Sequence, residues 1–144
     1  MNIHLQDISK DNYHDVCELS VSAAQQDFIA SNLWSVVDSF FVEGAQARAI
    51  YHQEHPVGLF LWVTQGDEVA IWRFMIDQRH QGQGLGQAAF RVALEQLQSR
   101  PGIRRIKISY VPDNHAARQF YQRFGFIETG LDQYGEMEAV LDLG

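Results

Sequence analysis

Three glycines stand close together in the hexapeptide Gln81-Gly82-Gln83-Gly84-Leu85-Gly86. An apolar stretch typical of a strand precedes this segment, and a stretch typical of a helix follows it. Glycine lets the backbone approach a ligand without a Cβ clash. The free N–H groups at a helix N-terminus attract anions. The segment therefore predicts a turn that binds a phosphate or pyrophosphate group.

Two common phosphate-binding motifs fit this segment less well. A P-loop ends in Gly-Lys-Ser/Thr, whereas Gly86 is followed by Gln87-Ala88. A dinucleotide fingerprint fits better, because residues 84–89 have the form G-x-G-x-x-A. That fold also needs an acidic residue at the tip of the next strand, and here the strand ends in Ser109-Tyr110-Val111. A nucleotide-dependent oxidoreductase and a turn that binds nothing are the alternatives.

A second dense pattern follows that strand, reading Asn114-x-x-Ala117-x-x-Phe120-Tyr121-x-x-x-Gly125-Phe126. Together the two segments closely resemble the GNAT superfamily of N-acetyltransferases, whose acetyl-CoA signature has the form Q/R-x-x-G-x-G/A. The motifs stand in the family's order, with one helix and one strand between them. The resemblance covers essentially the whole chain, and its specific motifs lie in the second half.

This resemblance implies that an amine attacks the thioester of acetyl-CoA, the co-substrate. Tyr121 stands where the family's tyrosine protonates the leaving thiolate, and the oxyanion would meet a backbone amide near Met75. Relatives carry a base or substrate carboxylate near the start of the central strand, which here is Glu68, beside Asp67. Many also carry an acid where this chain has Trp72. We therefore expect Tyr121 and Glu68 to be catalytic.

The same resemblance implies a set of residues that contact coenzyme A. Those from the central strand, the glycine-rich turn and the second motif are Met75, Ile76, Asp77, Gln81, Gly82, Gln83, Gly84, Leu85, Gly86, Asn114, Ala117, Tyr121 and Arg123.

The acceptor is expected to be a small cationic amine. Residues 73–77 and 121–126, and more faintly residues 26–32, resemble bacterial spermine/spermidine acetyltransferases. Asp27, Asp38 and Glu43 could receive such a cation, although a solvated helix face is the simpler interpretation for each. Acetylation of a protein N-terminus or of an antibiotic amine, and a non-catalytic acyl-CoA-binding domain, are the alternatives.

Periodicity predicts the elements that must position these residues. Strands are expected at residues 3–8, 48–52, 57–63, 69–76, 105–110, 126–132 and 136–143. Helices are expected from Ser9 or Asp11 to Gln26, from Ser31 or Asn32 through Phe41, and over residues 84–99 and 115–124. Trp34 and Trp62 are assigned to the core. The order β-α-α-β-β-β-α-β-α-β-β predicts one mixed α/β domain over residues 1–144, with the GNAT fold.

Composition narrows the class of protein further. The 144 residues carry a formal charge of −7, and residues 1–72 hold ten acids against two bases. Such a balance argues against nucleic-acid binding, which needs a basic stripe. No apolar run is long enough to span a membrane. Cys17 is the single cysteine, so the chain can form no internal disulfide, and a reduced, cytoplasmic compartment is expected. The six histidines form no metal-ligand pattern, so no metal is expected. A homodimer is compatible with the resemblance.

Overall fold

The computed structural model describes residues 2–26 and 31–144, which form seven strands and four α-helices around one mixed sheet. The strands are β1 (Ile3–Asp7), β2 (Ala45–His52), β3 (His55–Gln65), β4 (Glu68–Ile76), β5 (Arg105–Tyr110), β6 (Ile127–Leu131) and β7 (Met137–Asp142). The helices are α1 (Tyr13–Glu18), α2 (Asn32–Phe41), α3 (Leu85–Gln98) and α4 (His115–Arg123). The expected order of elements and the mixed α/β fold class are confirmed.

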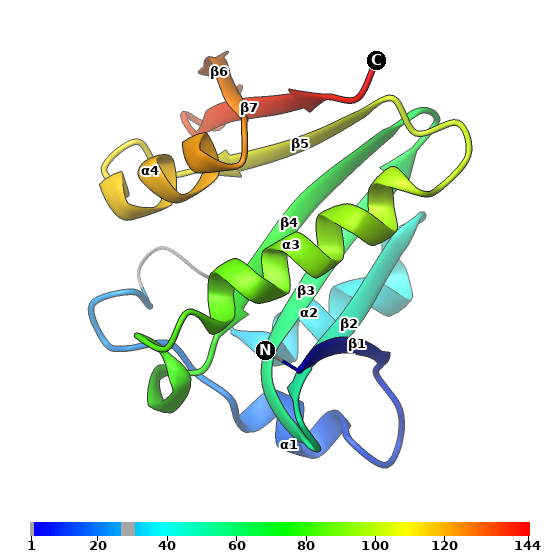
Figure 1. Ribbon diagram of the computed structural model, residues 1–144, viewed down its shortest axis with the longest axis vertical. Helices are drawn as coiled ribbons and strands as arrows, with labels where there is room; N and C mark the ends of the chain where they lie inside the picture. The colour runs from blue at the N-terminus through cyan, green and yellow to red at the C-terminus, as the bar shows by residue number, and fades with distance from the viewer. Residues whose placement is uncertain (1, 27–30) are drawn as a thin grey trace.

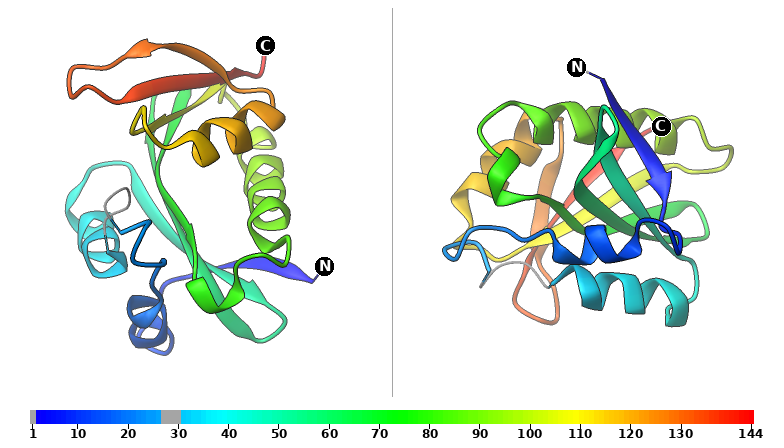
Figure 2. Two further views of the ribbon diagram at one scale, coloured as in Figure 1. Left: turned by 90° about the vertical axis from the view of Figure 1, so that its left-hand side faces the viewer. Right: turned by 90° about the horizontal axis from the view of Figure 1, so that it is seen from below.

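Helices cover both faces of the sheet. The spatial order of the strands is β1-β2-β3-β4-β5-β7-β6. Figures 1 and 2 show α3 lying along one face, with α1 and α2 on the opposite face. Each face has its own apolar core, a larger one under α3 and α4 and a smaller one under α1. The sheet is thus the middle layer of three.

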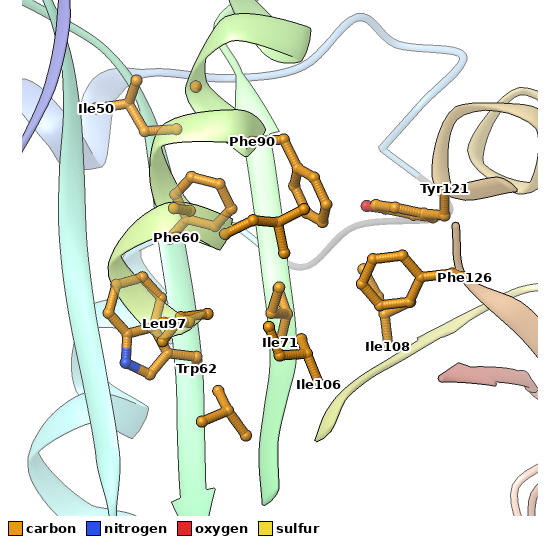
Figure 3. Close-up of a cluster of buried hydrophobic side chains, with 14 of the residues drawn as sticks. Ile50, Phe60, Trp62, Ile71, Phe90, Leu97, Ile106, Ile108, Tyr121 and Phe126 are labelled. Carbon is orange, nitrogen blue, oxygen red and sulfur yellow. The ribbon is translucent and has the colours of Figure 1, made fainter. Parts of the chain in front are cut away.

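Helix α3 packs its apolar side onto the larger core. Its apolar residues recur at helical spacing, and Leu85, Ala89, Phe90, Ala93, Leu94 and Leu97 are buried. Phe90 lies at the centre of an aromatic cluster with Phe60 and Tyr121, whose ring centroids are 6.1 Å and 5.3 Å from its own. Figure 3 shows Tyr121 reaching from α4 toward Phe90. This packing fixes α3 and α4 relative to each other.

The central strands β4 and β5 separate partway along their length. They run parallel and pair only from Glu68↔Arg105 to Ile71↔Ile108. Strand β5 continues beside β7 to Tyr110↔Met137, whereas β4 continues beside β3 to Gly58↔Ile76. Figure 1 shows the two strands diverging beyond their paired segment. The later half of β4 therefore has a strand neighbour on one side and a gap on the other.

Two expectations about the first helices are wrong. The predicted helix to Gln26 ends at Glu18, because Leu19 is extended and the Ser20 N–H donates to Asp77 Oδ1 at 2.9 Å. Contacts with the sheet therefore override local helix propensity here. Trp62 is buried as expected, but Trp34 is 63% exposed, because α2 turns that side away from the sheet.

Candidate active site

A cleft of about 1210 Å³ opens where β4 and β5 separate. Strands β4 and β5, the glycine-rich turn, the start of α3, helix α4 and the β6–β7 hairpin all contribute to its walls. Among the predicted site residues, those that line it are Met75, Ile76, Gln81, Gly82, Gly84, Leu85, Gly86, Asn114, Ala117 and Tyr121. The structure thus brings the two sequence motifs together in one cleft.

The start of α3 presents backbone donors to this cleft. Gly84 is the N-cap with φ 80° and ψ 7°, a left-handed conformation that glycine adopts without strain. The Ala88 N–H makes the first helical bond, to the Gly84 carbonyl at 3.2 Å. The N–H groups from Leu85 to Gln87 precede it and have no acceptor within the helix. With no acidic residue in the first turn, this end of α3 is suited to an anion.

Gly86 packs closely beneath the central strand. A Cβ added there would lie 3.6 Å from Ile76 Cγ1 and 3.8 Å from Phe74 Cζ, which is ordinary van der Waals contact. The position therefore accepts glycine or alanine, whereas the positive φ at Gly84 favours glycine.

The Gln81 side chain ties the glycine-rich turn to its surroundings. Its Nε2 donates to the Ile76 carbonyl at 2.8 Å and to Gln25 Oε1 at 2.9 Å. These bonds use the amide group to hold the turn against β4. The neighbouring Gln83 is exposed and lies outside the cleft lining.

The strand register decides which backbone groups of β4 face the gap. The Asp77 N–H donates to the Val57 carbonyl of the β3 side at 2.7 Å. Because orientation alternates along an antiparallel pair, Met75 also points its N–H toward β3. Phe74 and Ile76 then point theirs toward the gap, and the bond from Gln81 to the Ile76 carbonyl agrees with this direction. The free donors of the central strand are thus the neighbours of Met75.

Asp77 is a buried anchor outside the cleft lining. Its carboxylate accepts hydrogen bonds from the Ser20 N–H and from the Arg79 N–H and Nε. Burial desolvates this carboxyl and acts to raise its pKa, but the bonds from Ser20 and Arg79 and the Arg79 charge outweigh burial and lower the pKa. Asp77 therefore fixes the segment after α1 against the end of β4.

Tyr121 lies on the inner side of α4 at the cleft wall. It is 9% exposed, and its ring stacks on Tyr110 at 5.9 Å between centroids. Burial, with a smaller contribution from Tyr110, raises the pKa of Tyr121 above its ordinary value. Its hydroxyl therefore keeps its proton well beyond neutral pH. A protonated phenol at the wall of this cleft is suited to donate to a leaving group.

The rest of the second motif mainly builds α4. Asn114 Oδ1 accepts from the Ala117 N–H at 3.1 Å, which caps the helix. Both residues line the cleft, while the exposed Arg123 lies on the last turn of α4, outside the lining.

Glu68 is not brought into the cleft. It begins β4, seven residues before Met75, and its carboxylate pairs with Arg105 at 3.1 Å and Lys107 at 3.2 Å. At about 3.3 Å per residue, this puts Glu68 roughly 23 Å along the strand from Met75. At that distance along the strand, Glu68 has no access to an amine at the free end of β4.

The other acids expected to receive a cation are also placed elsewhere. Asp38 pairs with Arg73 at 2.7 Å, and Glu43 is exposed. Asp27 lies outside the described residues. Instead, carboxylates of the β6–β7 hairpin line the cleft, namely Asp132, Glu136 and Glu138.

Sequence reasoning missed this acidic wall because the hairpin carries no motif. The pairing Ser109↔Glu138 brings it beside β5. Only the strand order, in which β7 lies between β5 and β6, turns these carboxylates toward the cleft. The alternation of acids in Glu136-Met137-Glu138 was the one available signal.

Comparisons with known proteins agree with this fold. The model of the acetyltransferase (GNAT) family matches residues 8–126. A spermine/spermidine N(1)-acetyltransferase of Bacillus subtilis (strain 168) is 30% identical, over 99% of this chain and 100% of its own. Spermidine N-acetyltransferase from Vibrio cholerae, solved with CoA and spermine, has a TM-score of 0.79 at 14% identity, over 98% of this chain and 95% of its own. An aminoglycoside acetyltransferase solved with coenzyme A has a TM-score of 0.80 at 16% identity, with the same coverage.

The fold is shared with solved acetyltransferases. The chain belongs to the GNAT family, and it is an N-acetyltransferase. No helix within residues 2–26 and 31–144 is both long and apolar enough to cross a membrane.

Proposed function

We propose that this enzyme transfers the acetyl group of acetyl-CoA to a primary amine of a small polycation such as spermidine or spermine. The observation that carries the proposal is the acidic β6–β7 wall in the cleft, at Asp132, Glu136 and Glu138. The B. subtilis relative, named for spermine and spermidine, supports the same acceptor class.

Acetyl-CoA would lie between the separated strands. The N–H groups from Leu85 to Gln87 and the helix dipole would bind its pyrophosphate. The free backbone edge of β4 would bind the pantetheine arm, in the manner of an added strand. The cleft of about 1210 Å³ is large enough for both the cofactor arm and an amine.

The chemistry needs a neutral amine, a stabilised oxyanion and a protonated sulfur. An alkyl ammonium has a pKa near ~10.4 and must lose a proton before its nitrogen attacks the thioester carbonyl. The N–H groups of Phe74 and Ile76 would stabilise the negative charge that develops on the carbonyl oxygen. As the C–N bond forms and the C–S bond breaks, Tyr121 would donate its proton to the departing sulfur. The proton lost by the amine nitrogen balances the proton gained by the thiol.

The hairpin carboxylates would hold the charged ends of the acceptor. Asp132 Oδ1 already accepts from the N–H groups of Tyr134 and Glu136, so it also shapes the turn. Glu138 lies 3.7 Å from Lys107, whose nearer partner is Glu68 at 3.2 Å. Glu136 and Glu138 are therefore the acids best placed to pair with an ammonium and to accept its proton.

The test is a panel of acceptors with two glutamate variants. The acceptors to be compared are spermine, spermidine, putrescine, an aminoglycoside, a peptide with a free N-terminus and a monoamine. Glu136→Gln and Glu138→Gln should each raise the KM for spermine about tenfold or more, because a paired charge is lost. Glu95→Gln, an exposed acid on α3 outside the cleft lining, is the matched control.

Two results would contradict this proposal in different ways. A peptide or an aminoglycoside that outperforms every polyamine would assign the same cleft to another acceptor. An unchanged KM for spermine in both glutamate variants would show that Glu136 and Glu138 do not contribute to acceptor binding.

A further inference from the structure

Trp72 occupies an irregular position in the central strand. Strand β4 pairs with β3 through Ile71 and again through Arg73, so Trp72 is an extra residue without a β3 partner. A β-bulge of this kind re-aims the side chain that it carries. The pairing of β4 with β5 also ends at Ile71. Trp72 therefore stands where the two strands begin to separate, and it lines the cleft with 46% of its surface exposed.

The side chain of Trp72 lies on the face of the sheet opposite α3. Ile71 belongs to the larger core under α3, and Phe74 packs against that core. The two residues between them, Trp72 and Arg73, therefore point to the other face. The ion pair of Arg73 with Asp38 of α2 agrees with this direction, because α2 lies on that face. The indole ring thus borders the cleft from the face that carries α2.

A carboxylate of the acidic wall shares this face with Trp72. Ile71 and Ile108 pair side by side and point into the core under α3 (Figure 3). The next residues, Trp72 and Ser109, and the Ser109 partner Glu138 therefore share the opposite face. Adjacent strands lie about 4.8 Å apart, so the Cα atoms of Trp72 and Glu138 are roughly 10 Å apart, on either side of Ser109. All three residues line the cleft, so an indole ring and a carboxylate flank one open space above a small side chain.

Two cations near this space are already paired. Arg73 Nη1 lies 2.7 Å from Asp38 Oδ2. Lys107 Nζ lies 3.2 Å from Glu68 and 3.7 Å from Glu138, so its nearer partner leaves Glu138 able to pair with a second cation. The indole ring adds no charge, and its face attracts an alkylammonium. The space is therefore suited to an ammonium group held between a ring and a carboxylate.

We propose that Trp72 and Glu138 form a subsite for a second ammonium of the acceptor, which makes Trp72 a specificity-determining residue. This inference rests on the proposed function and names the side chain that selects a diamine over a monoamine. The N–H of Phe74, which faces the gap, lies two residues along β4, roughly 7 Å from Trp72. Neighbouring nitrogens of a polyamine are separated by a distance of this order. One nitrogen can therefore attack the thioester while the next, as an ammonium, lies over the indole ring.

The first test compares two amines of the same length. Putrescine carries a second ammonium where pentylamine carries a methyl group. Trp72→Leu keeps an apolar side chain but loses the ring, so kcat/KM for putrescine should fall about five- to tenfold, whereas that for pentylamine should stay within about twofold. Trp72→Phe keeps an aromatic face and should lose no more than about threefold with putrescine. Trp34→Leu, at a 63% exposed tryptophan outside the cleft lining, is the matched control and should change neither value.

A second test measures equilibrium binding without turnover. The enzyme is saturated with CoA, which has no acetyl group to transfer, and spermidine is titrated by calorimetry. The dissociation constant of spermidine should be about five- to tenfold higher in Trp72→Leu than in wild type or Trp34→Leu. Circular dichroism confirms that each variant is folded.

Several outcomes would overturn the subsite. Equal losses with putrescine and pentylamine in Trp72→Leu would mean that Trp72 only packs against the alkyl chain. Wild-type kinetics and spermidine affinity in Trp72→Leu, or the same losses in Trp34→Leu, would overturn it as well. Failure of the proposed function gives a different result, because wild type itself would then not favour putrescine over pentylamine, and both proposals would fall. A wild-type preference for putrescine that survives in Trp72→Leu overturns the subsite alone.

Discussion

Tyr121 and Asp77 both have shifted pKa values, and the physical balance behind each shift separates their roles. Burial dominates at Tyr121 and favours its neutral form. At Asp77, hydrogen bonds from Ser20 and Arg79 outweigh burial and favour the charged form. Tyr121 therefore holds a proton at the cleft, whereas Asp77 holds two chain segments together. The residue with the proton is the one expected to take part in chemistry.

Tyr121→Phe should lower turnover about 10²-fold, the usual size of general acid catalysis. The ring and its stacking on Tyr110 are kept, so the dissociation constant of acetyl-CoA should barely change. Stopped-flow acetyl transfer and calorimetric acetyl-CoA binding measure the two effects separately. Wild-type turnover in Tyr121→Phe, with chemistry rate-limiting, would mean that water protonates the sulfur.

The pH profile follows from the direction of the same shift. A raised pKa keeps Tyr121 protonated above its ordinary value of about 10, so its acid form is fully present from neutral pH to at least pH ~10. Over this range the amine loses its proton. The kcat/KM should therefore rise with pH up to about 10 and show no falling limb from Tyr121. Both wild type and Tyr121→Phe should share this rise.

At the scale of the element, the glycine-rich turn works through the conformation of its backbone. Gly84 adopts a positive φ at the N-cap of α3, whereas Gly86 lies within the first turn of the helix. A Cβ would therefore strain the backbone at Gly84, whereas at Gly86 it would only add side-chain contacts.

Gly84→Ala should weaken acetyl-CoA binding about tenfold, because the left-handed conformation costs a residue with a Cβ about 1–2 kcal/mol and the N–H groups would reorient. Gly86→Ala is the matched control. Its Cβ would meet Ile76 and Phe74 at ordinary contact distances, so affinity should stay within about threefold. Calorimetry with folded variants measures the two acetyl-CoA affinities. Equal affinities for Gly84→Ala and Gly86→Ala would show that the backbone conformation of Gly84 does not contribute to acetyl-CoA binding.

Local pattern and family resemblance predicted the order of elements, and they predicted that the glycine-rich turn and the Tyr121 helix belong to one site. They did not predict what depends on contacts between distant segments. The helix expected to reach Gln26 ends early because Ser20 bonds to Asp77, 57 residues away. The register of β4 with β5 places Glu68 in an ion-pair cluster. Likewise, the acidic wall at Glu138 depends on β7 pairing with β5.

At the scale of the whole molecule, charge acts differently on acetyl-CoA and on the proposed polyamine acceptor. The net charge of −7 attracts a polyamine and repels acetyl-CoA, which carries phosphates. The local donors at the start of α3 must therefore bind the anion against the overall field. The acidic cleft wall, in contrast, adds to that field.

Salt should consequently act in opposite directions on the two substrates. Between about 0.05 M and about 0.5 M NaCl the Debye length falls from roughly 14 Å to roughly 4 Å, so attraction between spermine and the cleft weakens. With acetyl-CoA saturating, kcat/KM for spermine should fall about tenfold or more, while that for a monoamine falls much less, because spermine carries several charges. The KM for acetyl-CoA, measured with spermine saturating, should stay level or decrease. A spermine kcat/KM that is independent of salt would show that charge does not select the acceptor, and the acidic wall would then have another role.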